Sequence, residues 1–88
     1  MATVLLPRSL LALFPGVERR HRLDGGTVDE ILSALDGAAP GMRERLVEGP
    51  RLRPHINVFV DGQPADLTTA VTEASTVHVI PAVSGGRR

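Results

Sequence analysis

The residues with the most distinctive chemical potential are two adjacent glycines near the end of the sequence, Gly85 and Gly86. They follow an apolar segment that ends at Pro81, where paired glycines have no evident structural purpose. Residues without a Cβ adopt extended and left-handed conformations and let other backbones approach closely. A carboxyl group on Gly86 could therefore enter a narrow active site of another protein, while Pro81 stiffens the exit from the folded body. The plainer interpretation is a flexible chain end.

The composition removes most other reactive groups from consideration. The 88 residues include no Cys and no Lys, and all ten basic side chains are Arg. This excludes a disulfide framework, a thiolate metal site, a thioester on the chain's own sulfur and Schiff-base chemistry. A chain of this size forms one domain with no room for a large substrate cavity.

Charge and hydropathy limit the kinds of partner that this chain is expected to bind. Ten basic residues balance ten acidic ones and only two aromatic residues occur, so nucleic-acid binding is not favoured. The apolar runs are too short to span a bilayer, and the first residues do not resemble a secretory signal. A cytoplasmic protein with neither a nucleic-acid nor a membrane partner is the expectation.

Other candidate constellations have plainer explanations. The three histidines, His21, His55 and His78, lie in separate segments without metal-ligand spacing, so we expect ordinary strand positions and no metal site. The run 19–22 contains three arginines and could either bind an acidic partner or form a solvated strand face. Gly25–Gly26 could cradle a phosphate before a helix, but a turn over 24–26 explains these glycines more simply.

A capping box predicts one main helix. The Thr27 hydroxyl can accept from the Glu30 backbone N–H, and the Glu30 carboxylate can reach back to the N–H of Thr27. This cap also accounts for Asp29 beside Glu30, which otherwise resembles a catalytic acid pair. Apolar residues then follow at helical spacing, at Val28, Ile31, Leu32 and Leu35. With Gly37 as the terminating residue, we expect a helix of about 8–10 residues.

Alternating and apolar runs predict the strands, at 3–6, 17–23, 55–60, 63–65 and 76–80. Asp61–Gly62 predicts a tight hairpin turn of the primed type. A second, short helix is expected near Pro40, closing at Gly49–Pro50 before a loop over 51–54; its inward residues are Met42, Leu46 and Val47. The segment 8–14 fits either a helical turn or an apolar loop.

This order of elements predicts an α+β fold of the β-grasp type, with a mixed sheet of four to five strands packed on one main helix plus a short second helix. The first two strands pair as a hairpin, and the crossover through the helix places a later strand parallel to the first. Residues 1–81 form the domain, and residues 82–88 form a flexible tail.

Four segments together resemble the ubiquitin-like sulfur carriers: Thr27–Leu32, Pro40–Leu46, Ile56–Gly62 and Ile80–Gly86. That family includes the small subunit of molybdopterin synthase, the thiamine sulfur carrier ThiS and the cysteine-biosynthetic carrier CysO. Residues 53–62 are most similar to the CysO-like branch.

The resemblance implies a carrier that is a co-substrate, not an enzyme, and that binds no cofactor itself. A ubiquitin-activating-type adenylating enzyme would use ATP and magnesium to adenylate the Gly86 carboxylate, and a sulfur donor would convert it to a thiocarboxylate for an acceptor enzyme. Gly85 would let the tail enter the partner. The stem gripped by partners would be Pro81, Ala82, Val83 and Ser84. The sheet face with Phe59 and the nearby arginines would be the docking surface.

The sequence departs from the simplest family pattern because Arg87 and Arg88 follow Gly86. The resemblance implies a precursor that a zinc-dependent JAMM-type protease cleaves between Gly86 and Arg87. Two functional alternatives stay open: a protein modifier conjugated through Gly86, and an interaction module with an inert tail. The acceptor of the sulfur also stays open among a pterin precursor, a thiazole precursor, cysteine and a specialised metabolite.

Overall fold

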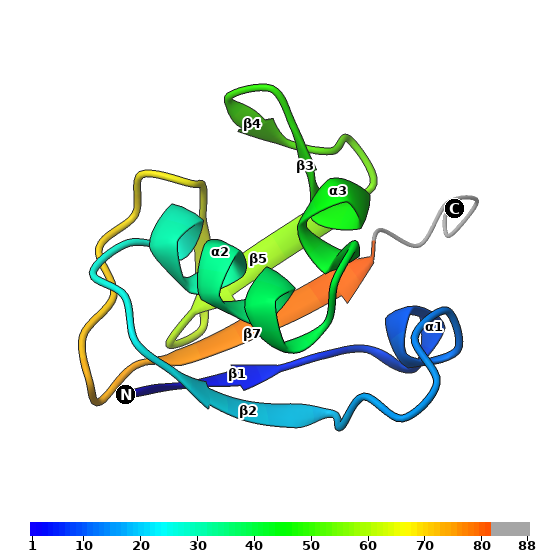
Figure 1. Cartoon of the computed structure of the whole chain (residues 1–88). Coiled ribbons are helices and arrows are strands. Elements are labelled where there is room, and N and C mark those ends of the chain that lie inside the picture. The colour runs from blue at the N-terminus through cyan, green and yellow to red at the C-terminus, as the bar shows by residue number, and fades with distance from the viewer. Residues whose placement is uncertain (82–88) are drawn as a thin grey trace.

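The computed structural model describes residues 1–81, which form a five-stranded mixed sheet with helices on one face (Figure 1). The sheet strands are β1 (Ala2–Leu5), β2 (Arg20–Leu23), β5 (Ile56–Val60), β6 (Gln63–Ala65) and β7 (Thr76–Pro81). Their order across the sheet is β2-β1-β7-β5-β6, with β1 and β7 parallel and the other pairs antiparallel. The hairpin, the parallel crossover and the β-grasp fold class are confirmed.

The remaining elements are helices α1 (Arg8–Leu11), α2 (Val28–Ala38) and α3 (Met42–Leu46), and a second sheet of β3 (Val47–Glu48) and β4 (Arg51–Leu52). Within residues 1–81, every helix is too short or too polar to traverse a lipid bilayer.

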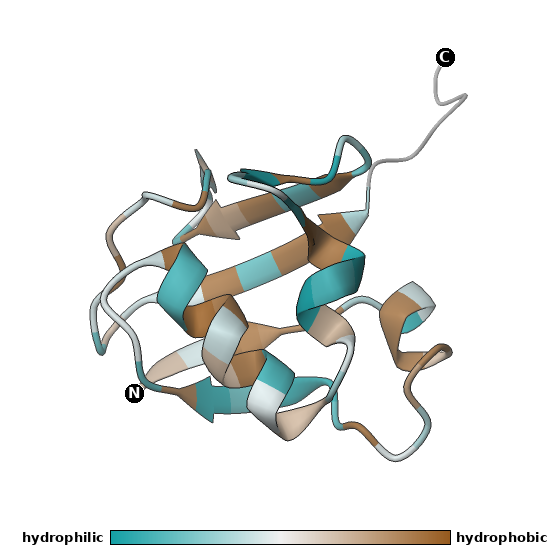
Figure 2. Ribbon diagram, turned by 45° about the horizontal axis from the view of Figure 1, so that its top comes forward, coloured by the Kyte–Doolittle hydropathy of each residue, from teal (hydrophilic) through white to brown (hydrophobic). Residues whose placement is uncertain are grey.

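The core lies between α2 and one face of the sheet. Strand residues alternate, so that Val4 faces Val77 and Val58 faces Val79 across the ladders, and all four are buried. The predicted stripe of α2 is fully buried against them, at Val28, Ile31, Leu32 and Leu35. Figure 2 shows this hydrophobic side of α2 turned toward the sheet. The inward residues predicted for the second helix, Met42, Leu46 and Val47, are also buried.

The capping box is confirmed in one half and wrong in the other. The Glu30 backbone N–H donates to Thr27 Oγ1 at 3.2 Å, as predicted. The Glu30 carboxylate, however, accepts from the N–H of Gly26 at 2.6 Å instead of that of Thr27. Gly26 has no Cβ, and an added one would lie 3.4 Å from Glu30 Oε1, so the absence of a side chain leaves the carboxylate a close path to this donor.

The predicted end of the main helix is also wrong, because α2 runs through Gly37 to Ala38 and has 11 residues. The left-handed glycine comes later, at Gly41 (φ 95°), where it begins α3. Asp36 Oδ1 accepts from the backbone N–H groups of Gly41 and Arg43, at 3.1 and 3.0 Å, and so fixes this reversal.

The predicted turn over 24–26 is instead a close pass of the chain beside α2, since a Cβ on Gly25 would lie 2.9 Å from the nitrogen of Ile31. The loop predicted over 51–54 is partly wrong: α3 ends at Leu46, and β3 and β4 pair around Gly49 (φ 60°). Segment 8–14 contains one helical turn, α1. At 61–62, positive φ values of 50° and 83° confirm the primed-type turn.

Candidate functional site

The base of the predicted tail is the end of β7, the central strand of the sheet. Pro81 is half-buried and pairs with Ile56 at the start of β5, so the chain reaches its last described residue within a paired strand. The other predicted stem, reactive and processing residues lie outside the described residues; they are Ala82, Val83, Ser84, Gly85, Gly86 and Arg87. The structure therefore places the base of the candidate site and the surface around it.

Phe59 lies on the face of the sheet opposite α2, in a row of side chains that crosses all five strands. The ladders place Phe59 opposite His78 and Pro64, His78 beside Leu5, and Leu5 opposite Arg20. We call these five residues the outer row. Leu5, His78 and Phe59 are half-buried, whereas Arg20 and Pro64 are exposed. Phe59 and an arginine thus share one face.

Apolar surface continues from the outer row to the base of the tail. Ile80 lies on the same face as His78, opposite Asn57, and its side chain is 42% exposed. It directly precedes Pro81. Exposed apolar side chains next to a polar rim are typical of protein-binding surfaces. This face can therefore bury apolar area against a partner that also contacts the chain after Pro81.

The arginines of β2 add positive charge to this face. Arg20 and Arg22 are exposed, and Arg22 donates to the Met1 carbonyl at 3.2 Å. Among residues 1–81, neither has a carboxylate within 4.0 Å; the ion pairs found there involve Met1, Arg43 and Arg53. Their charge is available to an acidic partner.

The histidines occupy three separate places: His21 in β2, His55 before β5 and His78 in the outer row. His21 Nε2 lies 2.7 Å from the Glu18 carbonyl oxygen. Across the part of the chain that the structure describes, no three His, Cys, Asp or Glu side chains lie together in a way that could hold a metal ion.

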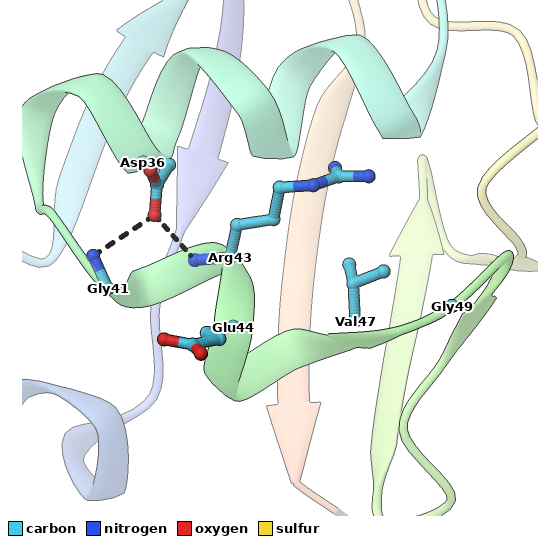
Figure 3. Close-up of a pocket in the computed structure, with 6 residues that line it drawn as sticks. All are labelled: Asp36, Gly41, Arg43, Glu44, Val47 and Gly49. Atoms are coloured by element: carbon cyan, nitrogen blue, oxygen red, sulfur yellow. Dashed lines mark hydrogen bonds between the residues drawn. The ribbon is translucent and has the colours of Figure 1, made fainter.

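A surface hollow of about 430 Å³ lies between α2 and α3 (Figure 3). The Arg43 guanidinium lies 2.6 Å from the Asp29 carboxylate and donates to Ser33 Oγ at 3.3 Å, while Asp36 holds the start of α3. These ion-pair and hydrogen-bond contacts connect α2 to α3. They are not arranged as a pair of catalytic groups. Asp29 and Glu30 have different partners, Arg43 and the Gly26 N–H, neither of which the capping box predicted.

The carboxyl group of Asp66 has a lowered pKa. Hydrogen bonds from the Thr68 hydroxyl and backbone N–H, at 2.6 and 2.9 Å, lower the pKa of Asp66 below its ordinary value of 3.8, and Thr69 adds to the effect. Asp66 is exposed and starts the turn that leads to Leu67, whose carbonyl accepts from the Asp29 backbone N–H. The perturbation belongs to this turn and not to the outer row.

Sequence reasoning identified Phe59 but missed Leu5 and Pro64 as its neighbours on the outer row. The signal was present in part, because His78 and Ile80 share a parity within their strand. Which strands lie beside one another, and in which register, had to come from the structure.

Comparisons with known proteins cover nearly the whole chain. The model of the ThiS family matches residues 9–86. Small archaeal modifier protein 3 of Haloferax volcanii is 33% identical over 67 residues, which are 72% of this chain and 73% of the relative. Sulfur carrier protein CysO of Mycobacterium tuberculosis is 28% identical over 91 residues, covering 96% and 97%.

Among solved structures, a chain of the Amycolatopsis orientalis BexX/CysO complex superposes with a TM-score of 0.86 at 31% identity, covering 98% of this chain and 100% of that one. By their names, the matched relatives are small carrier and modifier proteins, not catalysts in their own right. The expectation of a carrier-type protein is thus confirmed at this level.

Proposed function

The chain belongs to the ThiS family, and we propose on that premise that it is a sulfur carrier whose Gly86 carboxyl group is the reacting group. The observation that carries this proposal is where the family match ends. It runs through Gly85 to Gly86 and leaves out Arg87 and Arg88. The reacting position inferred from the paired glycines is therefore also the last residue that the family model matches.

The chemistry takes place in two steps on partner enzymes. First, the Gly86 carboxylate attacks the α-phosphorus of ATP in a ubiquitin-activating-type adenylating enzyme, and pyrophosphate leaves; magnesium is bound with the ATP. A sulfur nucleophile then attacks the acyl carbon and displaces AMP, which yields a thiocarboxylate. The thiocarboxylate sulfur then attacks an electrophilic carbon of a small-molecule acceptor held by a second enzyme and displaces its leaving group. Water cleaves the resulting thioester, which leaves the sulfur on the acceptor and restores the Gly86 carboxylate.

The folded body serves to position the tail. Gly86 is five residues beyond Pro81, so the carboxyl group reaches at most about 17 Å from the end of β7. A partner that receives it must come close to the sheet. We assign the docking contact to Ile80 and to the outer-row residues Leu5, His78 and Phe59, which lie on the same face as Ile80 on the strand that carries the tail and on its two neighbours. The solved complex of CysO with BexX supports the coarser expectation that a carrier of this kind docks on a partner protein.

Arg87 and Arg88 have to be removed before Gly86 has a free carboxyl group. The proposal therefore includes cleavage after Gly86, and a JAMM-type metalloprotease is the class of enzyme that the family resemblance supplies. A chain shortened to end at Gly86 bypasses this step and is the matched control for it.

A second function uses the same tail. The similarity to a small archaeal modifier protein favours conjugation, in which a lysine amine of another protein attacks the activated Gly86 carboxyl and forms an isopeptide bond. This chain has no Lys, so it cannot be extended through its own side chains.

Intact-mass spectrometry separates the alternatives. The protein is produced together with an activating enzyme, with and without the protease, and compared with the chain ending at Gly86. Loss of both arginines with replacement of one oxygen by sulfur supports the carrier. Covalent conjugates of higher mass support the modifier. An unchanged mass of the chain ending at Gly86, in the presence of an activating enzyme that adenylates a known carrier, contradicts both.

A further inference from the structure

The free edge of β2 carries a feature that the tail chemistry does not use. β2 is an edge strand of the sheet, and among residues 1–81 no strand pairs with its far side. On the β2 side of β1, the Leu6 N–H donates to the Arg19 carbonyl at 2.9 Å. On the β7 side of β1, the Thr3 N–H donates to the Ser75 carbonyl at 3.1 Å. Since the direction of these groups alternates along a strand, the backbone groups of Arg20 and Arg22 point away from β1.

The side chains at this edge form two different surfaces. Arg20 and Arg22 project on the outer face, exposed, with no carboxylate within 4.0 Å in the described part of the chain. His21 and Leu23 are half-buried and point to the opposite face, where α2 packs beside β2. Each position that offers free backbone groups thus also offers a positive charge on the same residue.

We propose that the β2 edge binds an extended acidic segment of a partner protein, which adds to the sheet as a further strand. Residues directly opposite each other in a sheet share a face, so acidic side chains two residues apart would lie opposite Arg20 and Arg22. The residue between them would lie beside His21 and Leu23 and would be apolar. The sequence feature recognised is therefore acidic–apolar–acidic in an extended conformation.

A second copy of the chain does not fit the same edge. Antiparallel pairing of two β2 strands through these free groups would place arginines of one copy opposite arginines of the other, and like charges directly opposite are destabilising. Charged edge residues of this kind keep a sheet from pairing with itself. An acidic strand removes the repulsion and satisfies the same backbone groups.

Binding of an acidic strand at the β2 edge does not depend on the proposed sulfur-carrier function. β1 separates β2 from β7, so a strand added at β2 leaves Pro81 and Ile80 uncovered. One partner can then hold the edge while another receives the tail.

The test titrates the full-length ¹⁵N-labelled chain with the capped peptide GEVEVEG and follows the backbone amide signals by NMR. The amide signals of Arg20 and Arg22 should shift and their hydrogen exchange should slow, and the affinity should fall with added salt. The same peptide methylated on its glutamate backbone nitrogens should lose binding. Equal binding of the methylated peptide, or shifts confined to other parts of the chain, would overturn strand addition.

Charge-reversal variants test the role of the arginines. The double variant Arg20→Glu, Arg22→Glu should bind GEVEVEG at least about tenfold more weakly, because like charges then face each other. It should gain binding to GKVKVKG, a rescue that an unfolded variant cannot give. The matched control Arg45→Glu, Arg51→Glu makes the same charge change at exposed positions of α3 and β4 and should keep both peptide preferences of the original chain. Loss of binding in both double variants alike would refute the proposal.

Discussion

Individual glycines in this chain are required for different physical reasons. At Gly25 an added Cβ would collide with the backbone at Ile31, and at Gly41 the backbone is left-handed. At Gly37, by contrast, a Cβ would meet nothing within 4 Å, and the residue lies inside α2. Gly86 differs from all three because its proposed role is close approach to another protein's catalytic groups.

In the chain that ends at position 86, replacing Gly86 by Ala should slow activation at least about tenfold while leaving the free energy of unfolding within about 0.5 kcal/mol of the original, since the proposed constraint lies in the partner and not in the core. Pyrophosphate release by the adenylating enzyme and chemical denaturation measure the two quantities. The control Gly37→Ala should be activated normally and be more stable by about 0.5–1 kcal/mol. Normal activation of the Gly86 variant would remove the close-approach argument.

Thr68→Val should raise the pKa of Asp66 toward 3.8, because the largest cause of its lowering is the Thr68 hydroxyl hydrogen bond. In the original chain this bond stabilises the folded state while Asp66 is ionised. Its contribution to the free energy of unfolding is lost as the pH falls through the lowered pKa of the folded protein. NMR titration of the Asp66 carboxyl carbon checks the shift. An unchanged pKa would show that the backbone donors alone suffice.

At the scale of elements, local signals predicted what local physics controls. The Thr27 cap and the spacing of Val28, Ile31, Leu32 and Leu35 were sufficient for α2, because both act within one helix. The prediction that the helix ends at Gly37 was wrong because the chain does not reverse direction there. Asp36 instead fixes the reversal at Gly41. β3 and β4 have two residues each, too few to show an alternating pattern.

Leu32→Ala should cost about 2–5 kcal/mol of unfolding free energy, because the side chain is fully buried between α2 and the sheet. Ser33→Thr, one residue later on the exposed side, keeps the hydroxyl that accepts from Arg43 and should change stability by no more than about 0.5 kcal/mol. Urea unfolding of both variants makes the comparison. Equal effects would mean that the buried face of α2 is misassigned.

At the scale of the whole molecule, β7 is central to the sheet and carries the tail, while the outer row crosses the strands beside it. The alternation of β5 puts Phe59 on the face opposite the buried Val58 and Val60, and the family resemblance predicted that this face is a docking surface. The assembly of Leu5, His78 and Phe59 into one row required the register between strands far apart in sequence. The proposed reacting residue, Gly86, was inferred from the composition and the paired glycines, and it lies outside the described residues.

Phe59→Asp should weaken docking of the activating enzyme by placing a charge on the outer row, which raises KM for the carrier severalfold and leaves kcat nearly unchanged. Ser33→Asp introduces the same charge at an exposed position of α2, on the opposite side of the sheet, and should leave KM and kcat unchanged. A lower kcat with unchanged KM in the Phe59 variant would instead place this residue's effect after docking.

The most direct measurement is tandem mass spectrometry of the carrier isolated after reaction with the processing protease, the activating enzyme, ATP and a sulfur donor. We expect the last fragment to end at Gly86, without Arg87 and Arg88, and to bear one sulfur in place of a carboxyl oxygen. Added sulfur on any other residue, beyond the native sulfur of Met1 and Met42, or a chain that transfers sulfur while both arginines are still attached, would contradict a reacting carboxyl group at Gly86.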